Sequence, residues 1–471
     1  MTRVDAPDGV LEGTWEGEVA VFRGVPFAAA PVGPLRWRPP APVDPWDGVR
    51  LAVEFAPAPL QPSPPSDSIM WHTNFVDRRP LVISEDCLYL NVWTPSPGPA
   101  AALPVMVWIH GGGNRYGYGS QDIHNGAALA RRGMVVVTLN HRLGSLGFLA
   151  HPGLAAEDEL GVSGNYGLMD IVAVLRWVRR SIAAFGGDPD KVTVAGNSAG
   201  AAHVTHLMAA PSCRGLFRAA IGQSSAGVFR AEGGMSAQQA GAGPFAGRSI
   251  EDLRRLSGVE LVLTGHFGPI VDGRLLTRDS QDVFLAGEQA PVPLLVGANT
   301  DEGANYTRPG DEDRLPGVPE VYPPGSAREF VGESRFNYPV WRWAVTHATT
   351  GAAPVWLYSF EHEPPLPAGL DLAAPPDGRA GYGVYHTAEL PYTADNLAMR
   401  DWPWTAADYD LATAMGDAWA AFVTDLDPGR GWPSFDGTDQ GAAMVFGRDI
   451  HVGRARRLEA MHLLDRLQRP L

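Results

Sequence analysis

The hydrophobic positions of the chain form short continuous runs that alternate with longer periodic stretches. Continuous apolar runs predict core strands at 88–93, 104–109, 134–140, 192–195, 293–297 and 355–360. Apolar residues at helical spacing predict helices over 168–185, 201–208 and 406–423. Two shorter pieces, 19–22 and 46–49, are also strand-like. Strands that alternate with helices indicate an α/β fold with a parallel or mixed sheet.

The strand runs show no polar alternation, which indicates a sheet that is buried on both faces. Stretches rich in Pro, Gly or acidic residues predict surface loops at 56–68, 309–326 and 363–380. No linker-like break interrupts the strand and helix signals. We therefore expect residues 1–471 to form a single large domain.

The pentapeptide Gly196-Asn197-Ser198-Ala199-Gly200 lies between a predicted strand and a predicted helix. This G-x-S-x-G pattern, in that context, is typical of a nucleophile elbow. Glycines allow the sharp turn, and the serine hydroxyl is then exposed near a helix N-terminus. Ser198 is the candidate nucleophile.

A second motif follows the predicted strand 104–109 and reads His110-Gly111-Gly112-Gly113. Such a turn supplies bare backbone N–H groups to a developing oxyanion, together with the residue after the nucleophile. The expected donors are Gly112, Gly113 and Ala199. A phosphate-binding loop is excluded, because no Gly-Lys-Ser/Thr follows and the chain has a single lysine, Lys191.

A serine nucleophile needs a carboxylate and a histidine, which follow it in that order in α/β-hydrolases. Glu302 lies just past the predicted strand 293–297, and His386 lies in a loop before an apolar segment. From the residues alone, a solvated loop acid is the favoured interpretation of Glu302, and His386 could equally be a surface or capping histidine.

Composition excludes several classes of protein. A net charge of −15 argues against nucleic acid and anionic membrane surfaces as partners. No apolar run reaches the length of a membrane span, and the N-terminus lacks the apolar core of a signal peptide, so we expect a cytoplasmic protein. The two cysteines, Cys87 and Cys213, are expected to be buried free thiols. We expect no cofactor and no metal, since the histidines show no H-E-x-x-H spacing.

Several further motifs, in one order along the chain, resemble those of the type-B carboxylesterases, the cholinesterase-like branch of the α/β-hydrolase fold. They are Phe22–Ala28, Pro31–Trp37, Glu85–Val92, Asn140–Phe148, Gly164–Asp170 and Phe185–Pro189. The resemblance implies a large central, mostly parallel mixed sheet flanked by helices, with a small N-terminal β-region. It also implies a Ser198–Glu302–His386 triad within one catalytic domain. His203 and His206 are then expected to be helix-packing residues.

The chain departs from the family pattern at several places. Asn197 stands where the family usually has Glu, and Asn114 where it usually has an aromatic residue. We expect both, together with Trp71, to line the substrate pocket. Pro59 replaces the usual partner of Cys87, and Ala226 replaces a serine that often supports the acid. The regions that roof the site, about 228–270 and 305–350, are shorter than usual, which predicts a more open mouth.

The sequence therefore predicts a serine hydrolase that cleaves a small-molecule carboxylic ester through an acyl-enzyme. The same machinery acting mainly on carbamates, amides or an unusual polyester is the alternative. A non-catalytic binding protein of this fold is disfavoured, because all three triad positions are filled. A monomer or a homodimer is expected.

Overall fold

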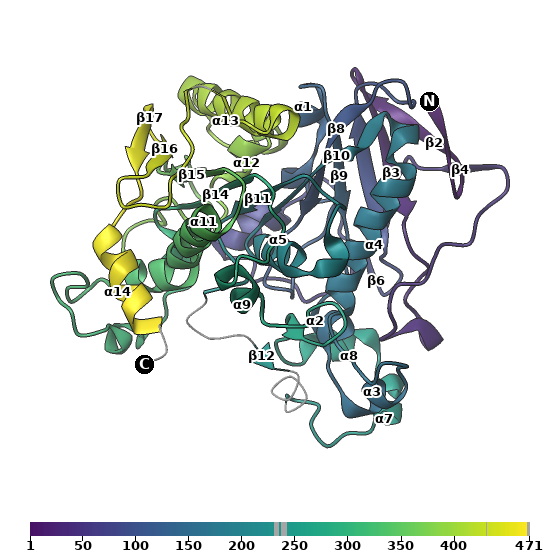
Figure 1. Ribbon diagram of the computed structural model, residues 1–471, viewed down its shortest axis with the longest axis horizontal. Coiled ribbons are helices and arrows are strands. Elements are labelled where there is room, and N and C mark those ends of the chain that lie inside the picture. The colour runs from purple at the N-terminus through teal and green to yellow at the C-terminus, as the bar shows by residue number, and fades with distance from the viewer. Residues whose placement is uncertain (230–234, 237–242, 430, 469–471) are drawn as a thin grey trace.

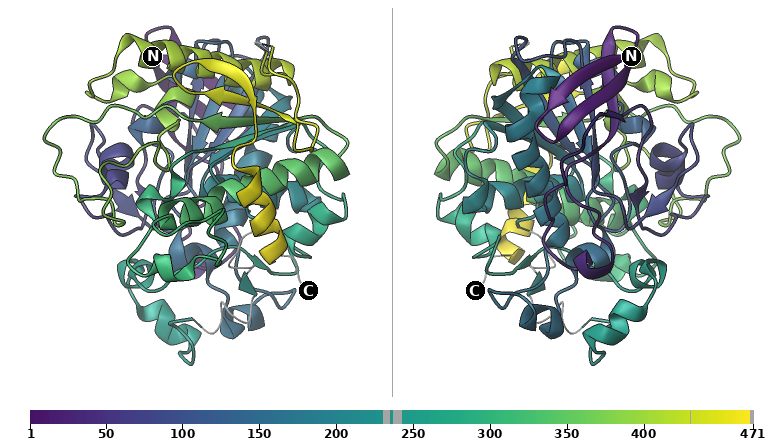
Figure 2. Two further views of the ribbon diagram at one scale, coloured as in Figure 1. Left: turned by 90° about the vertical axis from the view of Figure 1, so that its left-hand side faces the viewer. Right: turned by 90° about the vertical axis from the view of Figure 1, so that its right-hand side faces the viewer.

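A thirteen-stranded mixed sheet runs through the computed structural model, which describes residues 1–229, 235–236, 243–429 and 431–468. The strands follow in the order β1-β2-β3-β7-β9-β8-β10-β11-β14-β15-β16-β17, and β4 pairs with β2. They are β1 (Thr2–Ala6), β2 (Gly9–Glu16), β3 (Val19–Pro26), β4 (Val49–Leu51), β7 (Tyr89–Thr94), β8 (Leu103–Ile109), β9 (Val135–Leu139), β10 (Gly187–Asn197), β11 (Ala219–Gln223), β14 (Leu294–Asn299), β15 (Val355–Phe360), β16 (Ala442–Phe446) and β17 (Ile450–Arg454). Neighbours from β9 to β16 are parallel, whereas both edges of the sheet are antiparallel. Figure 2 shows the N-terminal strands β1 and β2, in purple, at one edge.

Helices cover both faces of this sheet (Figure 1). One face packs against α4 (Tyr166–Ser181), α5 (Ala199–Ala209), α9 (Ser280–Leu285), α11 (Tyr338–Thr350) and α14 (Leu458–Gln468). The other packs against α1 (Ala127–Ala130), α12 (Leu390–Thr393) and α13 (Ala406–Asp425). This arrangement confirms the mixed sheet flanked by helices that the sequence predicts.

The two hydrophobic cores explain why the strands lack polar alternation. In β8, Val105 and Val107 belong to the core on the α4 and α5 side, whereas Met106 and Trp108 belong to the opposite core. Successive side chains of a strand point to opposite faces, so both sets must be apolar when both faces are covered.

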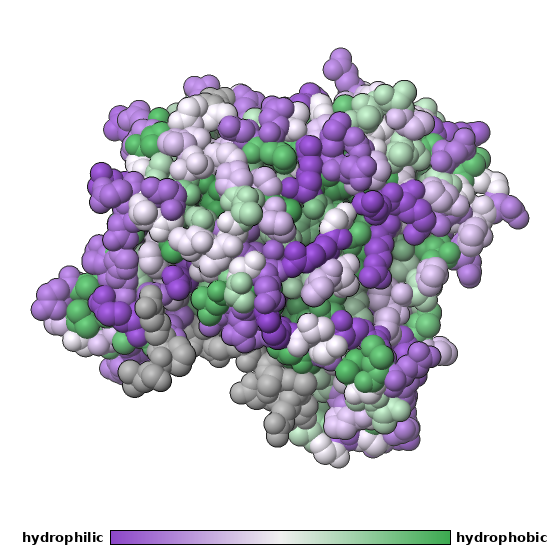
Figure 3. Space-filling model, in the orientation of Figure 1, coloured by the Kyte–Doolittle hydropathy of each residue, from purple (hydrophilic) through white to green (hydrophobic). Residues whose placement is uncertain are grey.

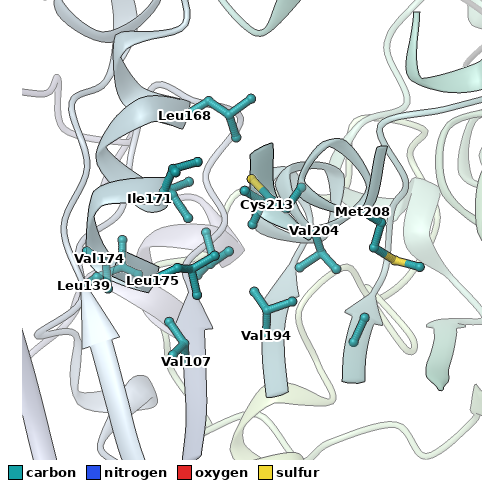
Figure 4. Packing of buried hydrophobic residues seen from close by; sticks show 14 of the residues in the cluster. Val107, Leu139, Leu168, Ile171, Val174, Leu175, Val194, Val204, Met208 and Cys213 are labelled. Carbon is teal, nitrogen blue, oxygen red and sulfur yellow. The ribbon is translucent and has the colours of Figure 1, made fainter. Parts of the chain in front are cut away.

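Figure 4 shows how α4 and α5 pack on the sheet. Leu168, Ile171 and Leu175 of α4 are fully buried, as their three- and four-residue spacing predicts. Val204 of α5 packs above Val194 of β10. This packing fixes α5 and β10, and the turn that joins them carries Ser198.

The predicted strands and helices are confirmed in the main, but some boundaries differ. The strand-like piece 46–49 contributes only Val49 to a strand, because Gly48 has a φ of +74°, which is not an extended conformation. The Trp46 side chain donates to the Val10 carbonyl at 3.0 Å. The helix predicted over 168–185 begins at Tyr166 and tightens to a 3₁₀ turn at Ile182–Phe185. The loop predicted at 309–326 includes a 3₁₀ turn at Asp311–Arg314.

The segment 305–350, which the sequence predicts to roof the site, includes at its C-terminal end a helix that belongs to the core instead. Helix α11 (Tyr338–Thr350) packs on β14 and β15, and its Trp343 is completely buried. A Cβ at Gly222 of β11 would lie 2.3 Å from the Trp343 ring, so this helix is part of the core. In the other predicted roof segment, 228–270, residues 230–234 and 237–242 lie outside the described residues.

Cys87 and Cys213 are both buried and both free of disulfide bonds. Burial raises the pKa of Cys213 to about 11 and raises that of Cys87 as well, so both are protonated at neutral pH.

A thiol reagent should therefore react with two thiols per chain in denaturant and with neither rapidly in the folded protein. Reductant should leave the melting temperature unchanged. A Cys87–Cys213 cross-linked peptide in a non-reducing digest would contradict this expectation.

On the face seen in Figure 3, polar side chains separate the hydrophobic ones into small patches. Among the described helices, none is both long and apolar enough to cross a membrane.

Candidate active site

Ser198 occupies a strained turn between β10 and α5. Its φ of +55° and ψ of −123° lie outside the regions that L residues favour, at a cost of about 1–3 kcal/mol. The flanking glycines make the turn possible. A Cβ at Gly196 would lie 2.5 Å from the Gly200 carbonyl carbon, and a Cβ at Gly200 would lie 2.1 Å from the Ile109 oxygen. The sequence pattern thus gives the elbow geometry that it predicts.

The glycine turn after β8 lies beside this elbow. Gly112 has φ +110° and Gly113 has φ +63°, both in the left-handed region that glycine tolerates. A Cβ at Gly112 would lie 2.2 Å from the Tyr116 oxygen. Gly112, Gly113 and Ala199 line the same cavity as Ser198. Ala199 is also the first residue of α5, where backbone N–H groups have no acceptor within the helix.

His386 and Glu302 are in direct contact. His386 Nδ1 lies 2.5 Å from Glu302 Oε2, and both side chains are at most 2% exposed. The other carboxylate oxygen, Oε1, accepts a hydrogen bond from the Asn299 N–H at 2.9 Å. His386 Nε2 is buried and makes no hydrogen bond to any described residue, Ser198 included. The imidazole therefore has one nitrogen fixed by a carboxylate and one available.

Two aromatic rings connect His386 to the cavity that Ser198 lines. The His386 ring centroid lies 4.5 Å from that of Phe336 and 5.3 Å from that of Tyr306. Both of these residues line the cavity. Ser198 thus lines an opening of about 420 Å³, and the buried His386–Glu302 pair lies behind two of the aromatic residues of its lining.

Asp301, the residue before Glu302, has a different position. Its Oδ2 accepts a hydrogen bond from the Val384 N–H at 3.0 Å, and its own N–H donates to the Val384 oxygen at 3.1 Å. These bonds hold the segment that leads to His386. Glu302 is the carboxylate that contacts the imidazole.

Of the three expected pocket residues, only Asn114 lines the cavity. Its φ of +59° lies in the left-handed region, which Asn adopts more readily than an aromatic residue does. Trp71 is not among the residues that line this cavity, whereas its neighbour Met70 is. Trp71 stands in a π-helical turn (Trp71–Phe75) and stacks on Phe75, with the ring centroids 6.4 Å apart.

Asn197 is also not among the residues that line the cavity. Its side chain is 1% exposed and turns away from the cavity to donate to Glu389 Oε1 at 3.0 Å. Glu389 also accepts hydrogen bonds from Gln223 at 3.2 Å and from Asn299 at 2.6 Å. Burial, and next the negative charge of Glu302, raise the pKa of Glu389.

Glu389 is the functional candidate that the sequence reasoning missed. It connects the segments of all three triad residues, because Asn197 precedes Ser198, Asn299 supports Glu302, and Glu389 follows His386 by three residues. The available signal was an acidic residue, Glu389, within the apolar stretch that follows His386.

Two histidines of α5, His203 and His206, contact neighbouring side chains and also line the cavity. His203 stacks on Phe148 at 5.8 Å, and burial lowers its pKa well below the ordinary value. His206 Nδ1 lies 2.9 Å from the Ser280 hydroxyl. Both histidines also line the cavity, in addition to the helix packing that the sequence predicts. Among the residues that the structure describes, no group of three or more His, Cys, Asp or Glu could hold a metal ion.

Comparison with known proteins places this geometry in a family. Residues 1–242 and 325–462 match the profile described as the Carboxylesterase family. The chain is 36% identical to the fumonisin B1 esterase of Sphingopyxis macrogoltabida, over 94% of this chain and 86% of that one. It is 33% identical to the para-nitrobenzyl esterase of Bacillus subtilis strain 168, over 91% of each. A carboxylesterase structure from Geobacillus stearothermophilus superposes with a TM-score of 0.79 at 31% identity, over 98% of this chain and 100% of that one. The chain therefore belongs to the carboxylesterase family, with its α/β-hydrolase fold, and is a carboxylic-ester hydrolase.

Proposed function

We propose that Ser198, Glu302 and His386 form a catalytic triad that hydrolyses carboxylic esters through an acyl-enzyme. The observation that carries this proposal is the 2.5 Å contact between His386 Nδ1 and Glu302 Oε2, which leaves Nε2 available. An imidazole held in this way presents its basic nitrogen to a hydroxyl. The strained elbow exposes such a hydroxyl at Ser198 in the cavity shared with Tyr306 and Phe336.

In the first half of the reaction, Ser198 Oγ attacks the ester carbonyl carbon while His386 Nε2 accepts the hydroxyl proton. Glu302 stays ionised and stabilises the imidazolium. The carbonyl oxygen becomes an oxyanion that accepts hydrogen bonds from the N–H groups of Gly112, Gly113 and Ala199. Each such donor typically contributes about 10²- to 10³-fold to kcat.

Collapse of the tetrahedral intermediate then breaks the bond to the leaving alcohol, which takes the proton from His386. The Ser198 acyl ester remains. Water enters, His386 removes one of its protons, and hydroxide adds to the acyl carbon. The second tetrahedral intermediate releases the carboxylic acid and returns the proton to Ser198 Oγ. Each step uses only the protons and electron pairs of the substrate, water and these side chains.

The choice between esters and the related carbamates or amides is tested by a substrate panel. Aryl acetates and longer aryl esters, aryl carbamates and acyl anilides are offered to the same enzyme preparation. We expect efficient turnover of the esters and slow or no turnover of the carbamates and anilides. Anilides or carbamates hydrolysed faster than every ester would replace the ester assignment with the alternative that uses the same triad.

Asn114 lies directly after the glycine turn and lines the cavity, so its size should limit the acyl or alcohol group. Asn114→Phe is expected to lower kcat/KM for bulky or branched esters while sparing acetates. Each methylene-sized clash in such a pocket is worth about 1–3 kcal/mol, or roughly 10- to 200-fold. The measurement is the ratio of kcat/KM for a bulky ester to that for an acetate, with a melting curve to check folding. An unchanged ratio in a folded variant would show that this side chain does not limit the substrate.

A further inference from the structure

Four arginines line the cavity that contains Ser198. They are Arg115, Arg308, Arg314 and Arg335, and the described lining residues include no Asp or Glu. The chain as a whole has the opposite balance, with 52 acidic against 37 basic residues. Among the described lining residues, the sign of charge is therefore opposite to that of the chain as a whole. A local excess of one sign raises the concentration of ligands with the other sign.

The arginines come from segments that also carry the groups around the candidate nucleophile. Arg115 follows the glycine turn by two residues. Arg335 directly precedes Phe336, and Arg308 follows Tyr306 by two residues. The rings of Phe336 and Tyr306 both contact His386. A substrate with its ester at Ser198 thus lies in a cavity whose lining includes these arginines.

Among the described residues, Asp311 is the carboxylate that pairs with an arginine of this cluster. Asp311 accepts a hydrogen bond from Arg314 Nη1 at 3.0 Å and one from the main-chain N–H of Arg308 at 2.7 Å. The guanidinium of Arg314 is therefore already engaged by a carboxylate.

Arg115 has no carboxylate partner within the described part of the chain. Its guanidinium lies 5.6 Å from the Tyr116 ring centroid, and its Nε atom is buried without a hydrogen bond. A buried charged donor left unpaired is unfavourable. A ligand carboxylate in the cavity would neutralise the Arg115 guanidinium, because this planar group can donate two parallel hydrogen bonds to a carboxylate.

We propose that this enzyme is selective for esters that carry a free carboxylate in addition to the ester bond. This inference rests on the proposed function, since it assigns the class of substrate at the same site. In an apolar pocket, desolvation would disfavour such a substrate against its neutral analogue. Here the arginines replace the lost hydration, so the carboxylate is the favoured form. Arg115 is the principal partner, and Arg308 with Arg335 contact a carboxylate that points to the His386 wall.

The carboxylate can belong to the acyl part or to the alcohol part of the ester, and two pairs of substrates separate these cases. The acyl pair is the mono-4-nitrophenyl ester of glutaric acid and the same ester with its free carboxyl as a primary amide. The alcohol pair is 4-acetoxybenzoate and 4-acetoxybenzamide. The members of each pair have nearly the same shape and differ in charge.

We expect kcat/KM to favour the carboxylate over the amide by at least about tenfold in one of the pairs. Ionic strength of about 1 M, at which the screening length falls to about 3 Å, should reduce this preference. Arg115→Gln and, separately, Arg308→Gln should lower the carboxylate-to-amide ratio. Arg308 is exposed, so its replacement does not endanger folding. The matched control is Arg255→Gln, an exposed arginine that pairs with Asp252 away from the cavity, and it should leave the ratio unchanged.

Equal or faster hydrolysis of the amide in both pairs would overturn the proposal. So would a ratio that falls as much in Arg255→Gln as in Arg115→Gln, since the effect would then come from net charge alone. Ser198-dependent hydrolysis of the neutral members without any carboxylate preference would overturn this inference and leave the proposed function intact. No hydrolysis in any arm would contradict the proposed function, and this inference with it.

Discussion

Replacement of Ser198 by alanine is expected to lower kcat for aryl-ester hydrolysis by about 10⁶-fold, as in other serine hydrolases. The loss is large because no other group can form the acyl-enzyme, so the only remaining contributions are binding and the oxyanion N–H groups. The folded state should persist. Ser198 already occupies an unfavourable backbone region, and alanine removes only the hydroxyl.

The measurement is kcat and KM for an aryl acetate, with the melting temperature of each variant. Ser181→Ala is the matched control, because it removes a buried hydroxyl that has no hydrogen-bond partner and lies outside the cavity. Its activity should stay within a few-fold of the parent. Substantial turnover by a purified Ser198→Ala protein would remove the nucleophile assignment.

The second large effect is expected at the base and the acid. His386→Ala should be nearly as damaging as the loss of Ser198, and Glu302→Gln should cost about 10⁴-fold. A glutamine in place of Glu302 keeps the size but no longer stabilises the imidazolium or selects the tautomer that leaves Nε2 basic. The 2.5 Å contact makes this dependence direct.

Asp301→Asn is the matched comparison for Glu302→Gln, since it makes the same chemical change one residue earlier. Asp301 bonds the backbone of Val384 and does not contact His386. A hydrogen bond to an ionised group contributes about 1.5–3 kcal/mol to stability, so we expect a lower melting temperature and a far smaller loss of kcat than in Glu302→Gln. If kcat fell steeply in Asp301→Asn and only mildly in Glu302→Gln, the catalytic acid would be Asp301 rather than Glu302.

Sequence predicted the elbow and the glycine turn because their geometry depends on local backbone requirements. At Gly196, Gly200 and Gly112, an added Cβ would meet backbone atoms at 2.1–2.5 Å, so the residue type alone is informative. Glu302 and His386 required the family resemblance, since a loop acid and a loop histidine have no local signature. Their contact depends on two segments that are 84 residues apart.

The remaining differences concern side-chain direction and long-range contacts. Asn197 adjoins Ser198, but adjacent residues at a strand end point to opposite sides, and its amide donates to Glu389. Trp71 stacks on Phe75, a contact that the sequence pattern does not show. The arginines that line the cavity come from separate segments of the chain, so no single stretch of sequence shows that they lie together.

The most direct test of the central claim is a mass-spectrometric map of the enzyme after reaction with a fluorophosphonate. Such a reagent phosphonylates an activated serine at the nucleophile position, as the serine oxygen bonds to phosphorus and fluoride leaves. The account predicts one adduct per chain, on the peptide that contains Ser198, with loss of esterase activity in proportion to labelling. It also predicts that His386→Ala is labelled far more slowly. An adduct on another serine that tracks the loss of activity, with Ser198 unmodified, would contradict the account.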